Sequence, residues 1–507
     1  MKTYMPLNGL RWSRNSGSAN CDMPQSAVFG RPGGVIKVIH GGMVECGERY
    51  FVSGVWDGAF EEGEFDTALS FHGTGGILKD DSVTFATPNL LQESLYSLTQ
   101  DGDFVISNSL PFLLAYTGNK LNPDYYDYEY DLNSIFFGCK RCVKELRLKD
   151  AAVNMHRYCN LKVSCDLSWE ELPKPAKVEL RTFEDYKYKM TETLSRIVGN
   201  ASDAKRKCKY NLVTTISKGY DASATSALVH DLGCDTALTF SSPEKYVHDS
   251  GVEIAKLLGF KNIIEGNGCA YMDNDNLWEA ESASCGDVGC LVAFNTFEKI
   301  YKDSILFLGL KGDSIWGKDE YLANRDFDFI KMSIAAEQNP EHYLRNNTIA
   351  ISVPLVLGYE WPSIYNINNS AEMADYSVGG EYDRPIPRRI VEEKGVPREA
   401  FGFKKQGAGF TYRFQPTLKS VRNKMSDTSY ESLLDFSKSL RRNPLKYYAH
   451  VCKYYMTNFP IYFNFVMHRL HLPFKVKSSS KYISSPISSL LILWGMDEMI
   501  KRYKKDL

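Results

Sequence analysis

The sequence predicts an α/β protein in which a β-rich N-terminal region precedes a doubly wound parallel sheet and a largely helical C-terminal part. Short apolar runs divided by Gly, Asp and Asn occupy residues 1 to about 170, a pattern typical of strands joined by turns. From about residue 210 to 320, strand-like and helix-like segments alternate, which indicates a parallel sheet covered by helices. Beyond residue 325 the chain combines helical spacing with many aromatic and basic residues.

Length and composition limit the class of protein before any motif is considered. The 507 residues suffice for two or three domains, and a hydrophobic content of 43% can fill a large core. A net charge of −2 gives no sign of a nucleic-acid partner. The 12 cysteines lack the density of a disulfide scaffold, so we expect a cytoplasmic protein with reduced thiols. No signal peptide is evident and the apolar run 487–496 is too short to span a bilayer, so we expect no membrane partner; a homo-oligomer is compatible with these features.

The N-terminal region, residues 1–170, is expected to form one β-rich domain. Its strand-like runs are short and β-branched or aromatic, and they lie at 35–39, 50–52, 83–85 and 104–106. The segment 167–177 turns to Trp, Glu, Pro and Lys, and we interpret it as a linker. Apolar residues at helical spacing then predict a helix over 183–198, at the start of a second domain over 180–507.

The second domain is predicted to contain four parallel strands. They are the runs 212–216, 237–240, 262–265 and 305–308, with helices following the first and lying over 250–259. Ligands of such sheets bind at the carboxyl ends of the strands. Two polar turns, 217–223 and 309–313, follow the first and fourth strands and would emerge at that edge.

The turn 217–223 joins a buried strand to a helix N-terminus, which is a geometry that binds phosphate. Ser217 and Ser223 offer hydroxyls, Lys218 offers a positive charge, and Gly219 allows the backbone to approach closely. Asp221 would repel a phosphate unless a divalent cation joined them, and Mg²⁺ prefers carboxylates together with phosphate oxygens. Asp313, after the fourth strand, is the candidate second carboxylate. The alternative interpretation is a helix-capping turn with a capping Asp.

Neither a Walker A loop nor a dinucleotide-binding glycine pattern is present. The turn instead resembles the pyrophosphate loop of the ATP-pyrophosphatase (PP-loop) superfamily, S-G-G-x-D-S-[ST]. Two further stretches resemble its asparagine-synthetase-like branch: 309–317 (GLKGDSIWG) is similar to the second acidic loop, G-x-G-x-D-E-x-x-x-G, and 383–405 is similar to the late segment that returns a lysine to the phosphates. The three stretches occur in the expected order over about 200 residues.

The resemblance implies an ATP- and Mg²⁺-dependent ligase that adenylates a carboxylate, releases pyrophosphate and forms an amide with an amine or ammonia. It implies that Asp221 and Asp313 hold Mg²⁺ and that Lys404 or Lys405 neutralises the charge that develops on the leaving pyrophosphate. It also implies contacts with ATP from a set of residues in the two turns and in the strand 237–240, which would lie near the adenine: Ser217, Lys218, Gly219, Asp221, Ser223, Thr239 and Gly312.

The sequence departs from the family pattern at three positions of the two turns. Lys218 replaces a glycine, Ala222 replaces a serine, and Ser314 replaces the glutamate that follows the second acid. One phosphate-contacting hydroxyl is therefore missing, and the amine of Lys218 can compensate as a point charge. These changes indicate an outlying branch, so the resemblance does not name the substrate.

The segment 102–109 (GDFVISNS) resembles the end of a glutaminase sheet, and we interpret residues 1–170 as a degenerate glutaminase-like domain. Glutamine-dependent asparagine synthetases begin their mature chain with a cysteine that attacks glutamine, whereas this chain begins Met1-Lys2-Thr3 and its first cysteine is Cys21. We therefore expect no glutaminase activity and a nitrogen donor other than glutamine. Two alternatives remain open: a glutamine-hydrolysing asparagine synthase, and a nucleotide-binding regulatory protein without catalysis.

Other candidate sites are better explained as structure. Cys139 with Cys142, and Cys285 with Cys290, have spacings that argue weakly for zinc. Glu372 and Arg384 could face the substrate, although a surface position is the simpler interpretation for Glu372. For Arg388 and Arg389 we favour helical pairing with Glu392 and Glu393, four residues on. The late aromatic residues are predicted to pack as a core cluster: Tyr447, Tyr448, Tyr454, Tyr455, Phe459, Tyr462 and Phe463.

Overall fold

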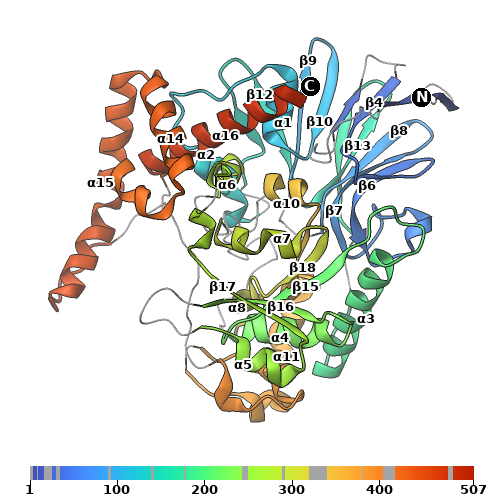
Figure 1. Ribbon diagram of the computed structural model, residues 1–507, viewed down its shortest axis with the longest axis vertical. Helices are drawn as coiled ribbons and strands as arrows, with labels where there is room; N and C mark the ends of the chain where they lie inside the picture. Colours follow the sequence, from blue (N-terminus) through green and yellow to red (C-terminus); the bar gives the residue numbers. More distant parts are fainter. Residues whose placement is uncertain are drawn as a thin grey trace.

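A computed structural model shows two facing, largely antiparallel sheets from the N-terminal region above a parallel sheet with helices (Figure 1). The predicted mixed α/β class is therefore confirmed at this level. The structure describes residues 4–7, 10–15, 26–29, 35–89, 93–138, 142–175, 178–241, 249–273, 275–287, 292–318, 340–380, 382–402, 417–477 and 483–506.

The first N-terminal sheet has eight strands in the order β1-β2-β4-β3-β10-β9-β12-β11, and all pairs except β2 with β4 are antiparallel. Because successive residues alternate between faces, one face of this sheet can bury its apolar residues against the second sheet. The strands are β1 (Tyr4–Leu7), β2 (Leu10–Asn15), β3 (Ser26–Phe29), β4 (Val35–Ile39), β9 (Leu95–Gln100), β10 (Asp103–Ser107), β11 (Glu145–Arg147) and β12 (Ala152–His156).

The second sheet is antiparallel, with the order β14-β13-β8-β7-β6-β5. A shared core of buried residues from both sheets, among them Ile36, Phe51, Phe85, Phe104 and Leu161, joins the two faces. All four strands predicted in this region are present. The second sheet consists of β5 (Glu45–Cys46), β6 (Tyr50–Trp56), β7 (Phe71–Leu78), β8 (Ser82–Ala86), β13 (Cys159–Ser164) and β14 (Trp169–Pro173).

The interpretation of 167–177 as a linker is wrong for part of that segment, because β14 pairs with β13 along its whole length. β14 is an edge strand, and none of its residues is buried. Edge strands carry charged residues and prolines that discourage further pairing, so their composition resembles that of a linker.

The parallel sheet has the order β17-β16-β15-β18-β19, and each neighbouring pair runs parallel. Four of its strands match the prediction; the fifth, β19, lies in the part of the chain predicted to be helical. The capping box of Thr182 and Asp185 fixes the start of the predicted entry helix, α3. The elements are β15 (Asn211–Thr215), β16 (Thr236–Ser241), β17 (Asn262–Asn267), β18 (Ser304–Leu308), β19 (Ile349–Ser352), α3 (Phe183–Ala201), α4 (Tyr220–His230) and α5 (Val252–Leu258).

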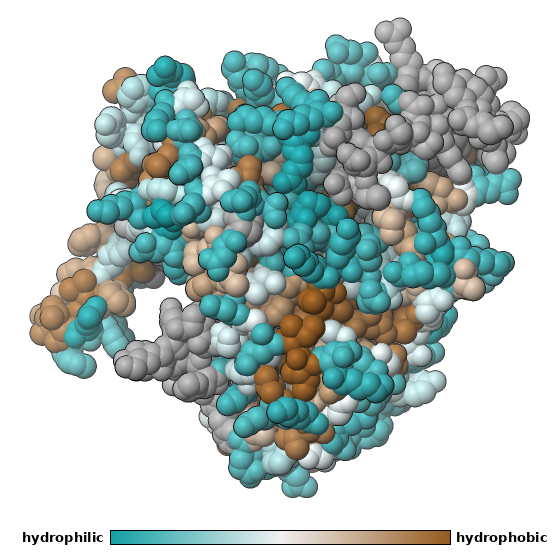
Figure 2. Space-filling view, viewed as in Figure 1, coloured by the Kyte–Doolittle hydropathy of each residue, from teal (hydrophilic) through white to brown (hydrophobic). Residues whose placement is uncertain are grey.

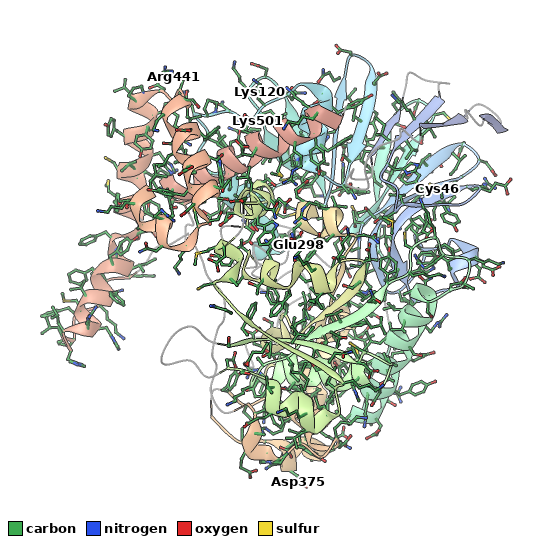
Figure 3. The ribbon with its side chains drawn as sticks, viewed as in Figure 1. Cys46, Lys120, Glu298, Asp375, Arg441 and Lys501 are labelled. Carbon is green, nitrogen blue, oxygen red and sulfur yellow. The ribbon has the colours of Figure 1, made fainter. Side chains whose placement is uncertain are left out.

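The remaining helices lie beside the parallel sheet and extend to the N-terminal sheets (Figure 1). In Figure 3, Glu298 lies near the middle of the molecule, whereas Asp375 marks the far end of the parallel-sheet part. The helices are α1 (Leu110–Thr117), α2 (Tyr128–Leu132), α6 (Trp278–Ser284), α7 (Glu298–Tyr301), α8 (Gly312–Ile315), α10 (Pro340–Asn346), α11 (Trp361–Asn368), α12 (Pro385–Glu392), α13 (Leu418–Val421), α14 (Asp427–Ser439), α15 (Pro444–Arg469) and α16 (Pro486–Asp506).

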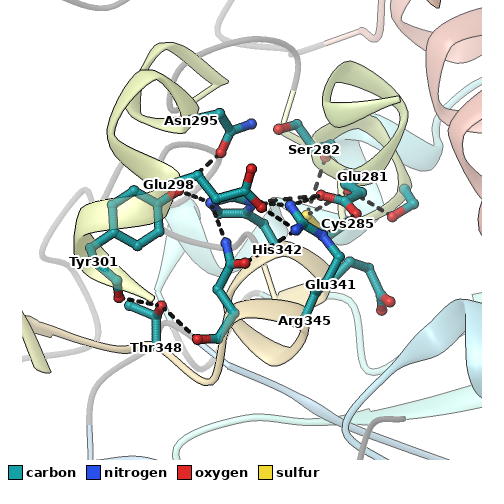
Figure 4. A network of polar contacts seen from close by, with 12 residues as sticks. Glu281, Ser282, Cys285, Asn295, Glu298, Tyr301, Glu341, His342, Arg345 and Thr348 are labelled. Atoms are coloured by element: carbon teal, nitrogen blue, oxygen red, sulfur yellow. Dashed lines mark hydrogen bonds and ion pairs between the residues drawn. The ribbon is translucent and has the colours of Figure 1, made fainter. Parts of the chain in front are cut away.

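A buried polar network joins α6 and α10 (Figure 4), and two residues of α16 donate hydrogen bonds to it. Arg345 on α10 binds both carboxylate oxygens of the fully buried Glu281 on α6, at 2.8 and 3.2 Å. Arg502 on α16 donates to the same carboxylate. A second buried acid, Glu341, accepts hydrogen bonds from Ser109 beside α1 and from Tyr503 on α16. α16 is therefore bonded to α6 and α10, and Glu341 connects α10 to Ser109 in the N-terminal region.

The predicted packing of the late aromatic residues is wrong. The exposed fractions of Tyr448, Phe459 and Tyr462 on α15 are 65%, 58% and 48%. The reason is that α15 leaves the body of the molecule, and beyond His450 none of its residues is buried (Figure 1). Of the helices in the described ranges, none combines the length and apolar character needed to cross a membrane.

His72 on β7 predicts a specific pH dependence of folding. Burial lowers the pKa of His72 to about 3 from 6.5, since the charged form would lose its hydration. The unfolded chain then binds a proton below pH 6.5 that the folded chain does not bind, so stability falls as pH drops from 6.5 towards 3. We expect the protonation of this residue in the unfolded chain to lower the free energy of unfolding by about 2 kcal/mol between pH 7 and pH 5. Urea unfolding of wild type and His72→Gln at both pH values tests this; equal losses in the two proteins would contradict it.

Candidate functional site

The two predicted turns lie at the carboxyl ends of neighbouring parallel strands. β15 and β18 are hydrogen-bonded in register, with Thr214 opposite Phe307. The turn after β15 leads into α4, and the turn after β18 leads into the short helix α8. The sheet topology therefore brings together the residues around Asp221 and Asp313, as the sequence predicts.

Asp221, in the first turn of α4, lies directly against the turn after β18. A Cβ atom added to Gly312 would lie 2.4 Å from Asp221 Oδ1, and one added to Gly309 would lie 2.5 Å from the Asp221 carbonyl carbon. Neither distance leaves room for a side chain. Gly312 therefore allows the carboxylate of Asp221 to lie against the backbone of the turn that carries Asp313, and Gly309 allows the main chain of Asp221 to approach the same turn.

Internal hydrogen bonds shape the turn 217–223. The Ser217 hydroxyl accepts from the Gly219 amide at 3.1 Å, and the buried Ser223 hydroxyl donates to the Ser217 carbonyl at 2.9 Å. Gly219 is the N-cap of α4 and uses an ordinary extended conformation. Ser217 and Ser223 thus shape the turn, which leads into the first turn of α4, where the backbone amides have no partner within the helix.

Asp249 is a site residue that sequence reasoning missed. Its Oδ1 atom accepts from the Lys218 amide at 3.2 Å, beside a bridge between Ser217 and Ser250. Burial raises the pKa of Asp249 to about 6, while the amide and the charge of Lys218 oppose the increase. The available signal was the position of this acid between the end of β16 and the start of α5, at the same edge of the sheet as the two turns.

Tyr382 marks the point at which the ionisable groups of the site converge. Its ring stacks on Tyr220, with the ring centroids 4.3 Å apart. Burial raises the pKa of Tyr382, and the negative charges of Asp221, Asp249 and Asp313 raise it further, while Arg384 opposes them. Three acids and one arginine from four separate segments therefore act on a single hydroxyl group.

The segment 383–402 reaches the turn after β15 by way of buried contacts. The Gly402 amide donates to the Lys218 carbonyl at 2.9 Å, and Gly402, at φ +76°, packs on the Tyr220 ring. Arg388 is fully buried and donates to the Gly402 carbonyl at 3.1 Å. The chain therefore arrives at the turn just before Lys404 and Lys405, which lie outside the described residues.

Several residues that the sequence suggested for substrate or ATP binding form hydrogen bonds or ion pairs that support the fold. Arg388 and Arg389 pair with the glutamates four residues on, at 3.3 and 2.7 Å, as predicted. Glu372 accepts from the Phe183 amide and supports the start of α3. The Thr239 hydroxyl accepts from the Gly251 amide at 2.8 Å, beside the N-terminus of α5.

The structure gives the cysteine pairs no metal role that can be described. The structure describes Cys142, which is partly buried, and Cys285, which is buried, whereas Cys139 and Cys290 lie outside the described residues. Within the described ranges, no group of three or more His, Cys, Asp or Glu side chains is placed to hold a metal ion. A cation bound between Asp221 and Asp313 would therefore need further oxygens from a ligand or from water.

Comparison of the chain with protein-family models finds no match, and no curated protein matches it significantly. The residues of the site itself are therefore the features that indicate a function. These are the carboxylate of Asp221 against the neighbouring turn, the acid that follows in that turn, and the lysine and serines of the turn 217–223.

Proposed function

We propose that this protein is an ATP- and Mg²⁺-dependent ligase of the asparagine-synthetase-like type, which adenylates a small carboxylate and then forms an amide from it. The observation that carries the proposal is the close packing of Asp221 against Gly309 and Gly312, at the ends of adjacent parallel strands. Two acids at the ends of adjacent parallel strands, beside a helix N-terminus, support the binding of a nucleotide pyrophosphate.

The residues present fit a magnesium–triphosphate group. Gly312 lies against the Asp221 carboxylate without a side chain between them, and carboxylates are the protein ligands that Mg²⁺ prefers. Asp221 and Asp313 would hold the ion, which would supply charge neutralisation on the phosphates. Lys218 adds a positive charge to the same turn, and the N-terminus of α4 adds its dipole.

In the proposed reaction, an oxygen of the substrate carboxylate attacks the α-phosphorus of ATP. The bond between the α-phosphorus and the α,β-bridging oxygen breaks, and the β- and γ-phosphates leave as pyrophosphate with both electrons of that bond. An amine or ammonia then attacks the acyl-adenylate, forms the amide, releases AMP and gives up one proton. Ser217 and Ser223 hold the turn in shape, and Lys404 or Lys405 neutralises the departing pyrophosphate.

Two measurements test the proposal. Calorimetry with Mg·ATP measures nucleotide binding without any knowledge of the carboxylate. Exchange of labelled pyrophosphate into ATP, screened over amino acids, sugar acids and other small carboxylic acids, then detects the adenylation step. We expect Mg·ATP binding and exchange that depends on one class of carboxylate. Absence of Mg·ATP binding would overturn the proposal, and binding without exchange across the screen would favour a regulatory nucleotide-binding protein.

Gly312 allows the packing of Asp221 to be tested separately. In Gly312→Ala the new methyl group would lie 2.4 Å from Asp221 Oδ1, so the carboxylate must move. We expect Mg·ATP affinity to fall by about tenfold or more, which corresponds to about 1.4 kcal/mol. Gly199→Ala in α3 is the matched control, since a Cβ there meets no atom within 4 Å. Equal affinity in the two variants, measured by calorimetry, would contradict the proposed geometry.

A further inference from the structure

The part of α15 from Val451 onwards and the segment that follows the helix form an apolar arm, defined here as residues 451–477. No residue of this arm is buried. Figure 2 shows its hydrophobic surface projecting from the left side of the molecule. Its largest exposed apolar side chains are spread along both the helix and the returning segment: Tyr455, Met456, Phe459, Ile461, Tyr462, Phe465, Val466, Leu470, Leu472, Phe474 and Val476.

The arm has a defined internal structure. After α15 ends at Arg469, the chain turns back, and Asn464 makes two side-chain hydrogen bonds with Val476, one to its amide and one to its carbonyl, both at 2.7 Å. Such paired bonds hold the returning segment along the helix. The apolar side chains of the helix and of the returning segment are thus exposed on the same arm.

The base of α15 is anchored to the rest of the molecule. Tyr126 stacks on His450 with ring centroids 4.5 Å apart, and His450 bonds the Ser484 carbonyl at 3.0 Å. At the start of the helix, Arg442 donates to the Pro123 carbonyl at 3.0 Å and to Ser489 at 3.1 Å. Because its base is held by these contacts, the arm is a projecting structural element and not a frayed chain end.

The charges along this part of the sequence have one sign. No Asp or Glu occurs from Phe436 to Met496, although Asp and Glu make up 62 of the 507 residues. Within the arm the charged residues are all basic: Lys453, Arg469, Lys475 and Lys477. An apolar surface with an exclusively basic charge complements a partner that is both apolar and anionic.

We propose that the arm docks on an anionic phospholipid surface, lying in the membrane interface without crossing it. Interfacial helices combine exposed Phe, Tyr and Leu with Lys and Arg, and their affinity adds apolar burial to attraction for anionic headgroups. Tyrosines suit this position because the ring enters the apolar layer while the hydroxyl stays hydrated. The proposal goes beyond the ligase activity, reverses the expectation of no membrane partner, and agrees with the lack of a spanning helix in the described ranges.

Two other partners fit the arm less well. A nucleic acid would use the aromatic rings and the basic charges, but the exposed aliphatic residues Ile461, Leu470 and Leu472 would gain nothing from it. A second copy of the arm would bring like charges together, which opposes association. A lipid surface is the partner that uses both the aliphatic residues and the charge.

Vesicle flotation with the full chain tests the proposal. We expect about tenfold tighter binding to phosphatidylcholine vesicles that contain phosphatidylglycerol than to phosphatidylcholine alone, and weaker binding as salt is raised. The triple variant Met456→Ser, Phe465→Ser, Phe474→Ser should reduce binding by about tenfold or more. Lys453→Glu with Lys475→Glu should remove the preference for anionic lipid.

Tyr188→Ser is the matched control, because Tyr188 is 71% exposed but lies on α3, far along the chain from the arm. This variant should bind vesicles as wild type does. All the substituted side chains are exposed, and far-ultraviolet circular dichroism checks that each variant is folded. The proposal is overturned if wild type ignores anionic vesicles, if the triple variant binds them equally well, or if wild type instead forms dimers or binds RNA through the arm.

Discussion

Replacing Asp221 by asparagine is expected to lower the rate of pyrophosphate exchange by about a hundredfold to a thousandfold. The amide keeps the shape of the side chain, so its packing against Gly309 and Gly312 is preserved. It removes the negative charge that would hold Mg²⁺ beside the phosphates, and electrostatic groups at a charged transition state supply the largest single catalytic term. The measurement is the initial rate of exchange with the carboxylate found in the screen.

The matched control is Asp231→Asn at the other end of α4. Asp231 forms an exposed ion pair with Lys394 at 2.5 Å, and surface pairs of this kind contribute little to stability. We expect exchange in this variant to stay near the wild-type rate. A similar loss in both variants would show that charge removal on α4 acts through folding and not through the proposed metal site.

Asp313→Asn allows the two carboxylates to be tested as a pair. If Asp221 and Asp313 hold one cation, the first substitution already removes the ion, so the second should lower the exchange rate little further. The exchange rate of the double variant should then be close to that of the slower single variant. Fully multiplicative losses would indicate that the two acids act independently. This outcome would contradict the assignment of a shared magnesium ion.

The fold was predictable where the local pattern and the tertiary role agree. β15, β16, β17 and β18 are short β-branched runs between turn residues, and they form as expected. β19 was missed because four residues between helical patterns carry too little periodicity to reveal a strand. The edge strand β14 was mistaken for a linker because exposed strands and linkers share polar residues and prolines.

The two turns of the site could be predicted from the sequence, but the prediction missed other residues of the site. Asp221 and Asp313 could be placed together because parallel strands deliver their turns to one edge. Asp249 was missed although its position between β16 and α5 places it at that edge. Tyr382 depends on a loop conformation that brings a distant segment to the site, and a single sequence contains no pattern for such a contact. The exposure of Tyr448 and Phe459 could not be foreseen either, since apolar residues at helical spacing look the same on a projecting helix and on a buried one.

Two buried glutamates on α6 should lose different amounts of stability when each is replaced by glutamine. Glu281 is fully buried between Arg345 and Arg502, whereas Glu279 accepts only from neutral groups, the Ser426 amide at 2.7 Å and the Ser429 hydroxyl at 2.6 Å. Burial would raise the pKa of Glu281, but Arg345, His342 and Arg502 together hold it well below its usual range. Burial raises the pKa of Glu279, and hydrogen bonds only partly offset this.

Glu281→Gln is therefore expected to destabilise the fold by about 3 kcal/mol, because it leaves two arginines without their shared counter-charge. The value lies at the low end for broken buried pairs, since the side chains of Arg345 and Arg502 remain 23% and 36% exposed. Glu279→Gln should cost less than about 1 kcal/mol, because serine hydroxyls can also accept from an amide. Urea unfolding at pH 7 measures both values.

The pH dependence of the Glu281→Gln effect distinguishes lost charge pairing from a simple packing defect. A carboxylate whose folded pKa is depressed contributes stability that is fully present above its unfolded pKa, here 4.5, and is lost as pH falls towards the folded value. The difference between wild type and Glu281→Gln should therefore be constant from pH 7 to about pH 5 and shrink below pH 4.5. A difference that stays constant throughout would show that Glu281 stabilises the junction of α6, α10 and α16 by shape alone.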